Sequence, residues 1–288
     1  MMRITAYKYQ ATGNDFVILD NREGQLELTE SQIKHLCDRK FGVGADGLML
    51  LNKSKRYSFS MVYYNADGKE GTMCGNGGRS LVAFAAHKGI KDFTFEAVDG
   101  IHEAEIIKYS PSTCIVKLGI SDVTSVKDYS PKSYMLNTGS PHLVIFVENV
   151  SDYDVREQGK LWRHHPHFPG GTNVNFVQGN WGRFNIPKFN EEQEQRISVR
   201  TYERGVEDET LSCGTGVTAS AIAHHKLLTR NKFSYSKIDI KVPQTVKNII
   251  ETQGGELLVE FTYTGEENST NINLTGPATY VFSCVIEC

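Results

Sequence analysis

The sequence predicts an α+β protein made of two pseudo-symmetric, strand-rich lobes, each with its sheet wrapped round one central apolar helix. Three observations predict this class: strand-like runs dominate the chain, two apolar helical segments each follow a cysteine–glycine motif, and the two halves repeat each other in order. A chain of 288 residues is long enough for two domains. We predict an N-terminal lobe of residues 1–130 plus 276–288 and a C-terminal lobe of residues 131–275.

Short runs rich in β-branched and aromatic residues are typical of strands. The expected strands, in chain order, are ITAYKY, FVILD, GLMLL, FSMVYY, CIVKL, HLVIFV, NVNFV, RISVRTY, KIDIKV, LLVEF and YVFSCVIE. Asp99-Gly100 lies between two alternating stretches in FTFEAVDGIHEAEII, which predicts a short β-hairpin.

Helices are fewer, and two of them have an unusual composition. LTESQIKHLCDRKFG places Thr29 and Gln32 at capping-box spacing, so a helix is expected to begin there and to end near Gly42. A second helix is expected over VREQGKLWRHH. The segments LVAFAAHKG and TASAIAHHKLL are apolar or small nearly all round, which predicts helices buried inside a lobe.

Three landmarks repeat between the halves and indicate a duplicated unit. TGNDFVILD, from Thr12, is matched 126 positions later by TGSPHLVIFV, from Thr138, and FGVGADGLMLL is matched by FPGGTNVNFVQ after 127 positions. CGNGGRS, from Cys74, is matched by CGTGVTA, from Cys213, after 139 positions. The longer third offset coincides with GNWGRFNIPKFNEEQEQ, which we predict to be an extended surface loop. We expect the two cysteine motifs to face each other across a cleft.

Composition narrows the classes of partner. The net charge of -3 comes without a basic stripe or an acidic tail, so we expect a small-molecule substrate and no nucleic acid. No segment has the roughly 18 apolar residues of a membrane span, and MMRITAYKYQ lacks the apolar core of a signal peptide. Six cysteines without CxxC pairs do not form a disulfide or zinc pattern. We therefore expect a cytoplasmic protein with reduced thiols, no metal site and no membrane partner.

Two further motifs are interpreted as structural. The histidine run HHPH, from His164 to His167, is interrupted by proline and has no partner motif nearby, so we interpret it as a solvated loop. GVGADG spells G-x-G-x-x-G, but a dinucleotide fingerprint follows a strand and opens a helix. Here a helix precedes the glycines and a strand follows them, which argues against nucleotide binding.

A cysteine at the start of a helix has a specific chemistry. Unpaired backbone N–H groups and the positive end of the helix dipole stabilise a thiolate and also bind a carboxylate. The glycines after Cys74 and Cys213 let those amides approach a ligand. Two such helix starts around one carboxylate suit inversion at its α-carbon, where one thiolate removes the proton and the opposite thiol returns one. This chemistry needs no cofactor. Cys37, Cys114, Cys284 and Cys288 lack the glycine context and are interpreted as packing or surface thiols.

With YNADGKEGTMCGNGGR and YERGVEDETLSCGTG assembled, the chain resembles diaminopimelate epimerase, a family of pyridoxal-independent racemases. The resemblance extends from TGNDFVILD through GSPH and GTNVNF to LTGPATYVF, which is nearly the whole chain. It implies the diaminopimelate epimerase-like fold and interconversion of L,L- and meso-diaminopimelate for lysine and peptidoglycan synthesis, without a cofactor.

The resemblance also implies roles for individual residues. Cys74 is expected to deprotonate the L,L substrate and Cys213 the meso form, with His142 beside the catalytic pair in a supporting role. The residues expected to cradle the reacting carboxylate through their amides are Gly75, Asn76, Gly214 and Thr215. Those expected at other parts of the substrate are Asn14 and Glu203, with Asn65, Asn173 and Arg204 at its distal amino acid end. Family members are usually homodimers with an aromatic residue near the C-terminus at the interface, and Phe282 holds that position.

The chain departs from the family pattern at three places. Many members carry glutamine where this chain has Gly47 and asparagine where it has Ser140. The interval from Arg204 to Cys213 is one residue longer than is common. These changes bear on substrate contacts and leave the two-thiol chemistry intact.

Three alternatives remain open on sequence grounds. Proline and hydroxyproline racemases share the chemistry, but a distal amino acid grip by Arg204 would have no use there. A cysteine peptidase built on Cys74, His142 and an asparagine would leave Cys213 and the duplication unexplained. A non-catalytic binding protein would tolerate alanine at both cysteines.

Overall fold

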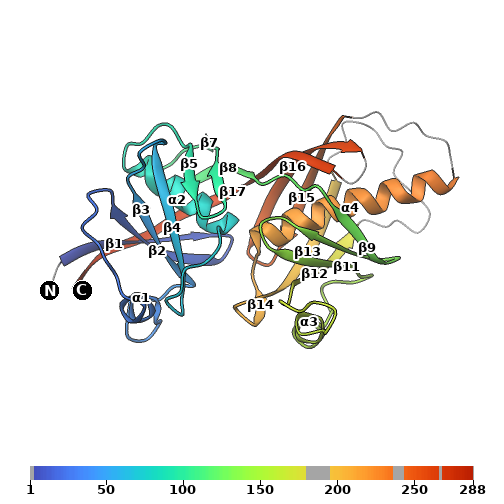
Figure 1. Ribbon diagram of the computed structural model, residues 1–288, viewed down its shortest axis with the longest axis horizontal. Coiled ribbons are helices and arrows are strands. Elements are labelled where there is room, and N and C mark those ends of the chain that lie inside the picture. Colours follow the sequence, from blue (N-terminus) through green and yellow to red (C-terminus); the bar gives the residue numbers. More distant parts are fainter. Residues whose placement is uncertain (1–2, 180–194, 236–242, 266–267, 288) are drawn as a thin grey trace. The chain divides into compact units, whose positions relative to one another are not determined.

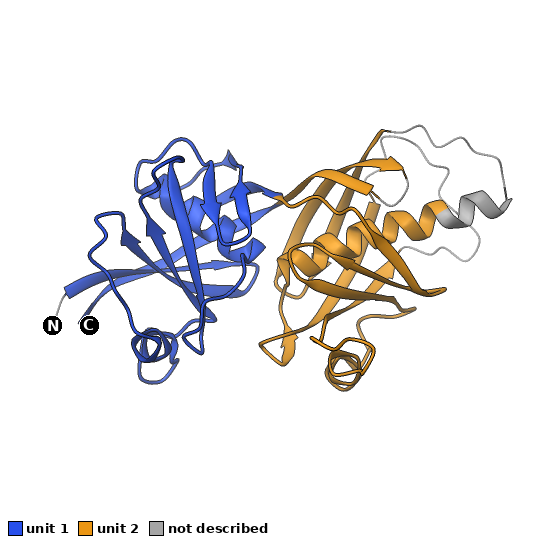
Figure 2. Ribbon diagram, viewed as in Figure 1, with its two compact units in different colours: residues 1–119, 275–288 blue, residues 120–274 orange. Residues whose placement is uncertain are grey.

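The computed structural model describes residues 3–179, 195–235, 243–265 and 268–287. The chain divides into two compact units, residues 1–119 with 275–288 and residues 120–274 (Figure 2). The expected strand KIDIKV and nearly all of the expected loop GNWGRFNIPKFNEEQEQ lie outside the described residues.

The first unit is a sheet built outward from two long antiparallel strands, β1 (Arg3–Ala11) and β2 (Asn14–Asn21). On one side β1 pairs with the C-terminal strand β17 (Asn268–Glu287), which in turn pairs with β8 (Thr113–Ile120). On the other side β2 runs parallel to β3 (Gly47–Asn52), and β3 is antiparallel to β4 (Phe59–Asn65). The short strands β5 (Phe95–Ala97), β6 (Gly100–His102) and β7 (Ala104–Lys108) complete the unit.

Two helices cover opposite faces of this sheet (Figure 1). The helix α2 (Gly75–His87) contacts β1, β2, β3 and β4, and every residue from Gly75 to Ala85 is buried. Each fully buried leucine, valine or phenylalanine there contributes about 1.5–3 kcal/mol. The shorter helix α1 (Glu30–Cys37) packs Ile33 and Leu36 against the other face of β2 and β3. Alternate residues of β2 therefore face different helices.

The second unit repeats this plan. Strands β9 (Val126–Ser130), β10 (Ser133–Asn137) and β11 (Pro141–Phe146) are antiparallel, and β11 runs parallel to β12 (Asn173–Gly179). Strand β13 (Gln195–Glu203) is antiparallel to β12 and to β14 (Asp208–Thr210), and parallel to β15 (Gln244–Thr252). Strand β16 (Gly255–Gly265) is antiparallel to β15.

The helices of the second unit occupy the same two positions (Figure 1). The long helix α4 (Gly214–Tyr235) contacts β10 to β13, β15 and β16, and it is buried from Gly216 to His225. The helix α3 (Val155–Arg163) packs against the other face of β12 and β13. The order strand, strand, peripheral helix, strand, strand, buried helix thus occurs in both units, with the short strand β14 added before the buried helix of the second. This is the predicted α+β class with one central helix per unit.

Several sequence predictions are refined by the structure. Thr29 and Gln32 form both hydrogen bonds of the capping box, but α1 ends at Cys37 and not near Gly42, because the Asp38 carboxylate accepts from the N–H groups of Lys40 and Phe41 and fixes a turn there. The predicted hairpin forms with Ala97 opposite Gly100, so its turn lies one residue before Asp99-Gly100.

The first unit ends earlier than the predicted residue 130. It ends at Gly119, because β9 pairs with β10 and Val123 exchanges backbone hydrogen bonds with Ser269 of the second unit. The second crossing lies between Leu274 and Thr275, one residue before the predicted position.

Candidate active site

Cys74 is the N-cap residue of α2. Its backbone is extended, with φ -107° and ψ 124°, and its side chain makes no capping hydrogen bond. The first intrahelical bond is from the Gly78 N–H to the Cys74 carbonyl, at 2.7 Å, so the amides of Gly75, Asn76 and Gly77 have no acceptor within the helix. The sulfur therefore lies at the positive end of the helix dipole, beside amides that can bind an anion.

Asn14 connects the β1–β2 turn to this helix start. Its Oδ1 accepts from the Cys74 thiol at 3.6 Å and from Asn76 Nδ2 at 3.5 Å. Its Nδ2 donates to Asp46 Oδ2 at 2.7 Å, which fixes the orientation of the amide. The structure thus brings together four of the expected residues of the first unit: Asn14, Cys74, Gly75 and Asn76.

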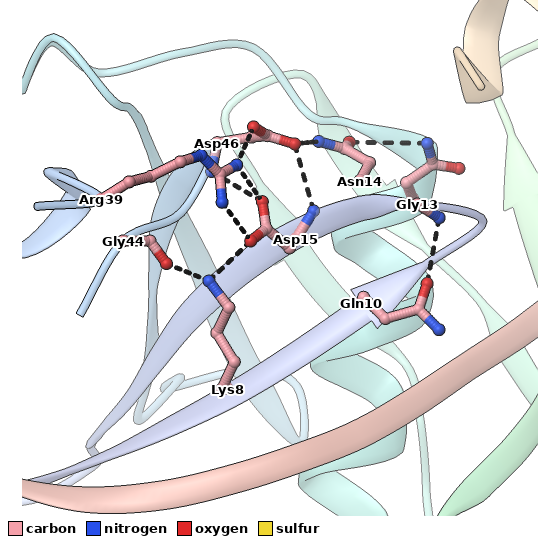
Figure 3. Close-up of polar contacts among 9 residues, drawn as sticks. Lys8, Gln10, Gly13, Asn14, Asp15, Arg39, Gly44 and Asp46 are labelled. Carbon is pink, nitrogen blue, oxygen red and sulfur yellow. Dashed lines mark hydrogen bonds and ion pairs between the residues drawn. The ribbon is translucent and has the colours of Figure 1, made fainter. Parts of the chain in front are cut away.

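A charged cluster holds Asp46 in place behind Asn14 (Figure 3). Arg39 donates to both oxygens of Asp15, at 2.9 and 2.7 Å, and to Asp46 at 2.7 Å, while the buried Lys8 pairs with Asp15 at 2.7 Å and donates to the Gly44 carbonyl. Burial raises the pKa of Asp15, but the hydrogen bonds from Arg39 and Lys8 outweigh burial and hold it well below its ordinary range. The Asp15 carboxylate therefore stays charged, and the bonds of Arg39 to Asp15 and Asp46 hold the Asp46 oxygen that accepts from Asn14.

Asn65 is exposed at the end of β4, where Gly47 of β3 is opposite it. A Cβ at Gly47 would lie 2.5 Å from the Tyr63 ring, and one at Gly71 would lie 2.8 Å from the same ring. The Tyr63 ring thus fills the space that a side chain at position 47 would need. The departure from glutamine at this position is accompanied by an aromatic ring and not by an empty space.

Cys213 occupies the same position in the second unit, immediately before α4. The Val217 N–H bonds the Cys213 carbonyl at 2.9 Å, so the amides of Gly214, Thr215 and Gly216 lack an intrahelical acceptor. Cys213 is buried, and its sulfur lies 3.6 Å from the Thr215 hydroxyl.

A chain of polar groups runs from the sheet to this hydroxyl. Asn175 accepts from the Thr201 hydroxyl at 2.9 Å and donates to the Leu143 carbonyl at 3.2 Å, which fixes its amide; its Nδ2 also lies 3.1 Å from His142 Nδ1. His142 Nδ1 must therefore accept, and the ring proton is on Nε2. That nitrogen lies 3.0 Å from Thr215 Oγ1 and 2.9 Å from Ser140 Oγ.

His142 is neutral in this setting. Burial, reinforced by the positive charge of Arg204, lowers the pKa of His142 to about 3. When the neutral imidazole donates from Nε2 to the Thr215 hydroxyl, that hydroxyl can donate its own proton to another acceptor. Two acceptors are within reach, the Cys213 sulfur at 3.6 Å and Ser140 Oγ at 3.4 Å. The arrangement can support a thiolate at Cys213 through a neutral hydrogen bond.

The remaining expected residues of the second unit surround the end of β13. Asn173 Nδ2 donates to Ser140 Oγ and to the Pro141 carbonyl, both at 3.1 Å, and its Oδ1 accepts from the Arg204 N–H at 2.9 Å. Arg204 Nη1 donates to the Gly170 carbonyl at 3.3 Å. Glu203 Oε2 accepts from the Thr210 hydroxyl at 2.9 Å.

The other cysteines have different surroundings. Burial raises the pKa of Cys37 to about 12, and burial likewise raises the pKa of Cys114. Both thiols are packed into the core and stay protonated at neutral pH.

Neither the histidine run nor any other part of the described chain forms a metal cluster. No group of three or more histidine, cysteine, aspartate or glutamate residues that could hold a metal ion occurs among the described residues. His165 and His167 pack against aromatic rings, and His164 lies 3.3 Å from Glu207. Among the helices of the described residues, none is long and apolar enough to cross a membrane.

Sequence analysis missed three residues at these sites: Asp46, Asn175 and Arg79. Asn175 carried a signal, since it lies two residues after Asn173 in the strand NVNFV, and alternate residues of a strand point to the same face. Arg79 carried another, since it is a charged residue within an apolar helix that was expected to be buried.

Comparison with known proteins identifies the family. The sequence pattern that defines diaminopimelate epimerase matches residues 6–121 and 134–281. Diaminopimelate epimerase of Flavobacterium psychrophilum is 44% identical over 97% of this chain and 99% of its own length. The enzyme of the same name from Chlorobaculum tepidum is 40% identical over 94% of this chain and 96% of its own length.

Solved structures share the fold at low sequence identity. A phenazine biosynthesis protein of the PhzF family from Bacillus anthracis superposes with a TM-score of 0.70 at 17% identity, and the match covers 100% of both chains. A hydroxyproline epimerase from Agrobacterium vitis has a TM-score of 0.61 at 13% identity, over 99% of this chain and 92% of its own. These two likenesses concern the fold alone. On the family pattern and the close relatives, the chain belongs to the diaminopimelate epimerase family, whose members are isomerases.

Proposed function

We propose that this protein interconverts L,L-diaminopimelate and meso-diaminopimelate by proton transfer between one thiolate and one thiol. The observation that carries the proposal is the matched pair of cysteines, each at the start of the buried helix of its unit, in a chain of this family. Cys74 removes the α-proton of the L,L substrate and Cys213 supplies a proton to the opposite face. In the reverse direction Cys213 removes the α-proton of the meso form.

The helix starts meet the electrostatic demand of this reaction. Removing an α-proton leaves negative charge that spreads into the neighbouring carboxylate, and backbone N–H groups at a helix start stabilise charge of that kind. The amides of Gly75, Asn76, Gly214 and Thr215 are the proposed donors, since each lies before the first intrahelical bond of its helix. Thiols supply both the acid and the base, so we propose that no cofactor takes part in the proton transfers.

Asn14 and Glu203 are proposed to bind the polar groups around the reacting carbon. Asn14 already contacts the Cys74 sulfur through its Oδ1, so it reaches the site of proton transfer from the sheet. Glu203 ends β13 in the second unit, and its carboxylate is suited to accept a hydrogen bond from the substrate α-ammonium group.

Arg204 is proposed to hold the distal carboxylate, with Asn65 and Asn173 as neutral partners. A guanidinium has five N–H donors in a planar fork that matches a carboxylate, and Arg204 uses one of them on Gly170. Asn173 holds the Arg204 backbone through its Oδ1, so its contribution includes the placement of that side chain.

His142 is proposed to support Cys213 through Thr215. The neutral ring donates from Nε2 towards the Thr215 hydroxyl, which lies 3.6 Å from the Cys213 sulfur. A hydroxyl that already accepts a hydrogen bond can donate its own proton to a thiolate. His142 is thus a positioning residue and takes no proton from the substrate.

We also propose that the protein is a cytoplasmic homodimer. The mechanism requires both thiols to stay reduced, which the cytoplasm ensures. On β17, Val281, Phe282 and Val285 are exposed by 51%, 42% and 65%, an apolar stretch suited to contact with a second copy. Replacing Phe282 by glutamate should lower the sedimentation coefficient to that of a monomer, and an unchanged coefficient would argue against this interface.

The activity is tested with the reduced protein after chelator treatment and without added pyridoxal phosphate. Separate incubations contain L,L-diaminopimelate, L-proline or trans-4-hydroxy-L-proline, and chiral chromatography follows each product. We expect meso-diaminopimelate to form and both proline compounds to stay unchanged, because Arg204 would have no distal carboxylate to bind in a proline. Epimerisation of a proline compound alone would overturn the proposed substrate.

A further inference from the structure

Arg79 is a charged side chain in an unusual place. It is fully buried, at 0% exposure, in the second turn of α2, and it is the largest fully buried side chain among the described residues. Cations stabilise a helix near its C-terminus, where the dipole is negative, whereas Arg79 lies one turn from the N-terminus. A buried guanidinium at the positive end of a helix needs a nearby negative charge to be stable.

No carboxylate of the described chain supplies that charge. Arg79 Nη1 donates to the Gly75 carbonyl at 3.2 Å, and Nη2 donates to Asn76 Oδ1 at 2.9 Å and to Thr12 Oγ1 at 3.5 Å. Among the described groups Arg79 Nε has no hydrogen-bond partner. All three acceptors are neutral, so the hydrogen bonds orient the guanidinium without balancing its charge.

The group that can balance it is the sulfur at the start of the same helix. Burial lowers the pKa of Arg79 to about 10, so the side chain keeps its proton at neutral pH, and the one charge that acts in the opposite direction on it is that of Cys74. The two side chains are connected through the first turn: Arg79 donates to the Gly75 carbonyl and to Asn76 Oδ1, Asn76 Nδ2 donates to Asn14 Oδ1, and the same Asn14 oxygen accepts from the Cys74 thiol.

The carboxylates on the strands that contact α2 are paired with other cations. This helix contacts β1, β2, β3 and β4. On β1 and β2, Lys8 pairs with Asp15, while Tyr9 contacts His87 at the far end of the helix. Among the remaining ionisable groups of β1 and β2, Arg3 pairs with Glu287, Tyr7 accepts from Lys88 and Asp20 pairs with Arg22. Strand β4 has the phenols Tyr63 and Tyr64, and β3 has no ionisable group.

We propose that Arg79 is the buried counter-ion of the Cys74 thiolate, so that Cys74, and not Cys213, carries the negative charge in the substrate-free enzyme. The inference rests on the proposed function for the role of Cys74 as a base, but the charge state itself can be measured without substrate. When Cys74 ionises, its proton goes to solvent and the guanidinium gains the anion that its neutral partners do not supply. The free enzyme is then prepared to accept a proton from the L,L substrate.

The hydrogen bond from the Cys74 thiol to Asn14 opposes this ionisation only weakly. A thiol is a poor donor, and Asn14 Oδ1 also accepts from Asn76 Nδ2 at 3.5 Å, so the oxygen keeps a partner when the sulfur loses its proton. A full positive charge in a buried site outweighs one weak neutral hydrogen bond.

The second unit provides the matched comparison. Thr218 lies five residues after Cys213, as Arg79 lies five after Cys74, and its hydroxyl donates to the Gly214 carbonyl at 3.0 Å. The side-chain bond to the first helical carbonyl is therefore present in both units, and at this matched position the first unit has a cation and the second a neutral hydroxyl. The Cys213 sulfur lies 3.6 Å from the Thr215 hydroxyl.

The test measures the ionisation of each thiol in the full, reduced chain. Short pulses of iodoacetamide between pH 5 and pH 10 label thiolates, and mass spectrometry of digested protein gives a separate pH midpoint for Cys74 and for Cys213. Exposure changes the rate of labelling but not its midpoint. We expect the Cys74 midpoint to lie at least about one pH unit below that of Cys213, which is a tenfold difference in thiolate fraction.

Variants then assign the difference to Arg79. Arg79→Met should raise the Cys74 midpoint by about one unit or more and leave Cys213 unchanged, whereas Arg79→Lys, which keeps a cation, should restore most of the shift. Thr218→Val is the control and should move neither midpoint. If Arg79→Met does not fold, the order of the Cys74 and Cys213 midpoints in the unaltered protein still tests the proposal.

Two results would overturn the proposal: equal or reversed midpoints in the unaltered protein, or an Arg79→Met variant that labels Cys74 as before. A variant that raises only the KM for substrate, with both midpoints unchanged, would assign the charge of Arg79 to the substrate carboxylate instead. Failure of the proposed function would give a different result. If the protein had no epimerase activity but its midpoints shifted as expected, the role of Arg79 as counter-ion would still hold and only the proposed function would be wrong.

Discussion

Cys74 and Cys213 lie at the same point of a repeated scaffold, yet different groups support each sulfur. Behind the helix start in the first unit, β2 and β3 place Phe16 opposite Gly47, and Met49 Sδ lies 3.2 Å from where a Cβ would be at Gly77. Behind the helix start in the second unit, β11 and β12 place His142 opposite Asn173, and Asn175 Oδ1 lies 2.3 Å from where a Cβ would be at Gly216. Equivalent strand positions are apolar in one unit and polar in the other.

The comparison shows which features the two copies of the duplicated unit share and which features differ between them. The threonine–glycine turn, the cysteine before the helix and the glycine three residues later occur in both units, because each helix start must expose its amides. The groups that tune the sulfur have diverged: a buried cation within α2 in the first unit, and a neutral chain from the sheet, Asn175, His142 and Thr215, in the second.

The largest expected contrast between the units is their response to acid. Burial lowers the pKa of His142 to about 3 and that of His224 to about 4, from an ordinary value of 6.5, so the unfolded chain takes up protons first. The second unit therefore loses stability as pH falls below about 6.5, by about 2 kcal/mol per histidine between pH 7 and pH 5.

The contribution of His102 in the first unit to stability changes with pH in the opposite direction. Burial lowers its pKa, but hydrogen bonds to Asp99 and to the Gly119 carbonyl outweigh burial and raise it, so its stabilising contribution is present below pH 6.5 and is lost as pH rises through the folded-state value. Hydrogen exchange followed by mass spectrometry at pH 7 and pH 5, corrected for intrinsic exchange rates, should show lost protection in α4 and β12 before α2 and β2. Equal loss in both units would contradict this sign assignment.

The next contrast concerns the distal residues. Arg204→Met should lower kcat/KM by about 10- to 150-fold, because a charged hydrogen-bond partner is lost, while Asn65→Ala should lower it by about 2- to 10-fold, because a neutral one is lost. Arg204→Lys should lie between Arg204→Met and the unaltered protein, since lysine keeps the charge but not the planar fork. Steady-state kinetics with L,L-diaminopimelate measures all three. If Asn65→Ala lowered kcat/KM more than Arg204→Met did, the main contact with the distal amino acid end would belong to the first unit.

Gly77 and Gly216 offer a matched pair for stability. A Cβ at Gly216 would lie 2.3 Å from Asn175 Oδ1, and Asn175 is fully buried and hydrogen-bonded to Thr201 and Leu143, so it cannot move freely. We expect Gly216→Ala to lower the free energy of unfolding by about 1–3 kcal/mol. Gly77→Ala should cost less than about 1 kcal/mol, because the Met49 side chain is flexible. Urea titrations give both values, and a larger loss for Gly77→Ala would contradict the account of these contacts.

Part of this comparison could be predicted from the sequence, and part could not. The capping box at Thr29, the buried character of the helices after Cys74 and Cys213, and the repeat itself are local patterns that survive folding. The partnership of Asn175 with His142 depends on two parallel strands 33 residues apart in sequence, which no local pattern specifies. The strand β15 was missed because QTVKNIIET has neither clear alternation nor a continuous apolar run.

The smallest expected effect tests the neutral support of Cys213. Thr215→Val removes the hydroxyl between His142 and the sulfur, while Thr215→Ser keeps it. We expect Thr215→Val to lower kcat in the meso-to-L,L direction by about 5- to 10-fold, the value of one neutral hydrogen bond, and to leave the opposite direction less affected. Thr215→Ser should stay within about twofold of the unaltered protein in both directions. Equal losses in both directions for Thr215→Val would show that the hydroxyl serves the substrate carboxylate and not the base.

The most direct test of the whole account follows the substrate α-proton. The reduced protein and its Cys74→Ser and Cys213→Ser variants are incubated with L,L-diaminopimelate in deuterated water, and proton NMR with chiral chromatography monitors the α-carbon. We predict meso product carrying deuterium at one α-carbon for the unaltered protein, and a loss of turnover of about 100-fold or more in each serine variant. Deuterated meso product formed at an unchanged rate by either variant would contradict a mechanism that needs both sulfurs.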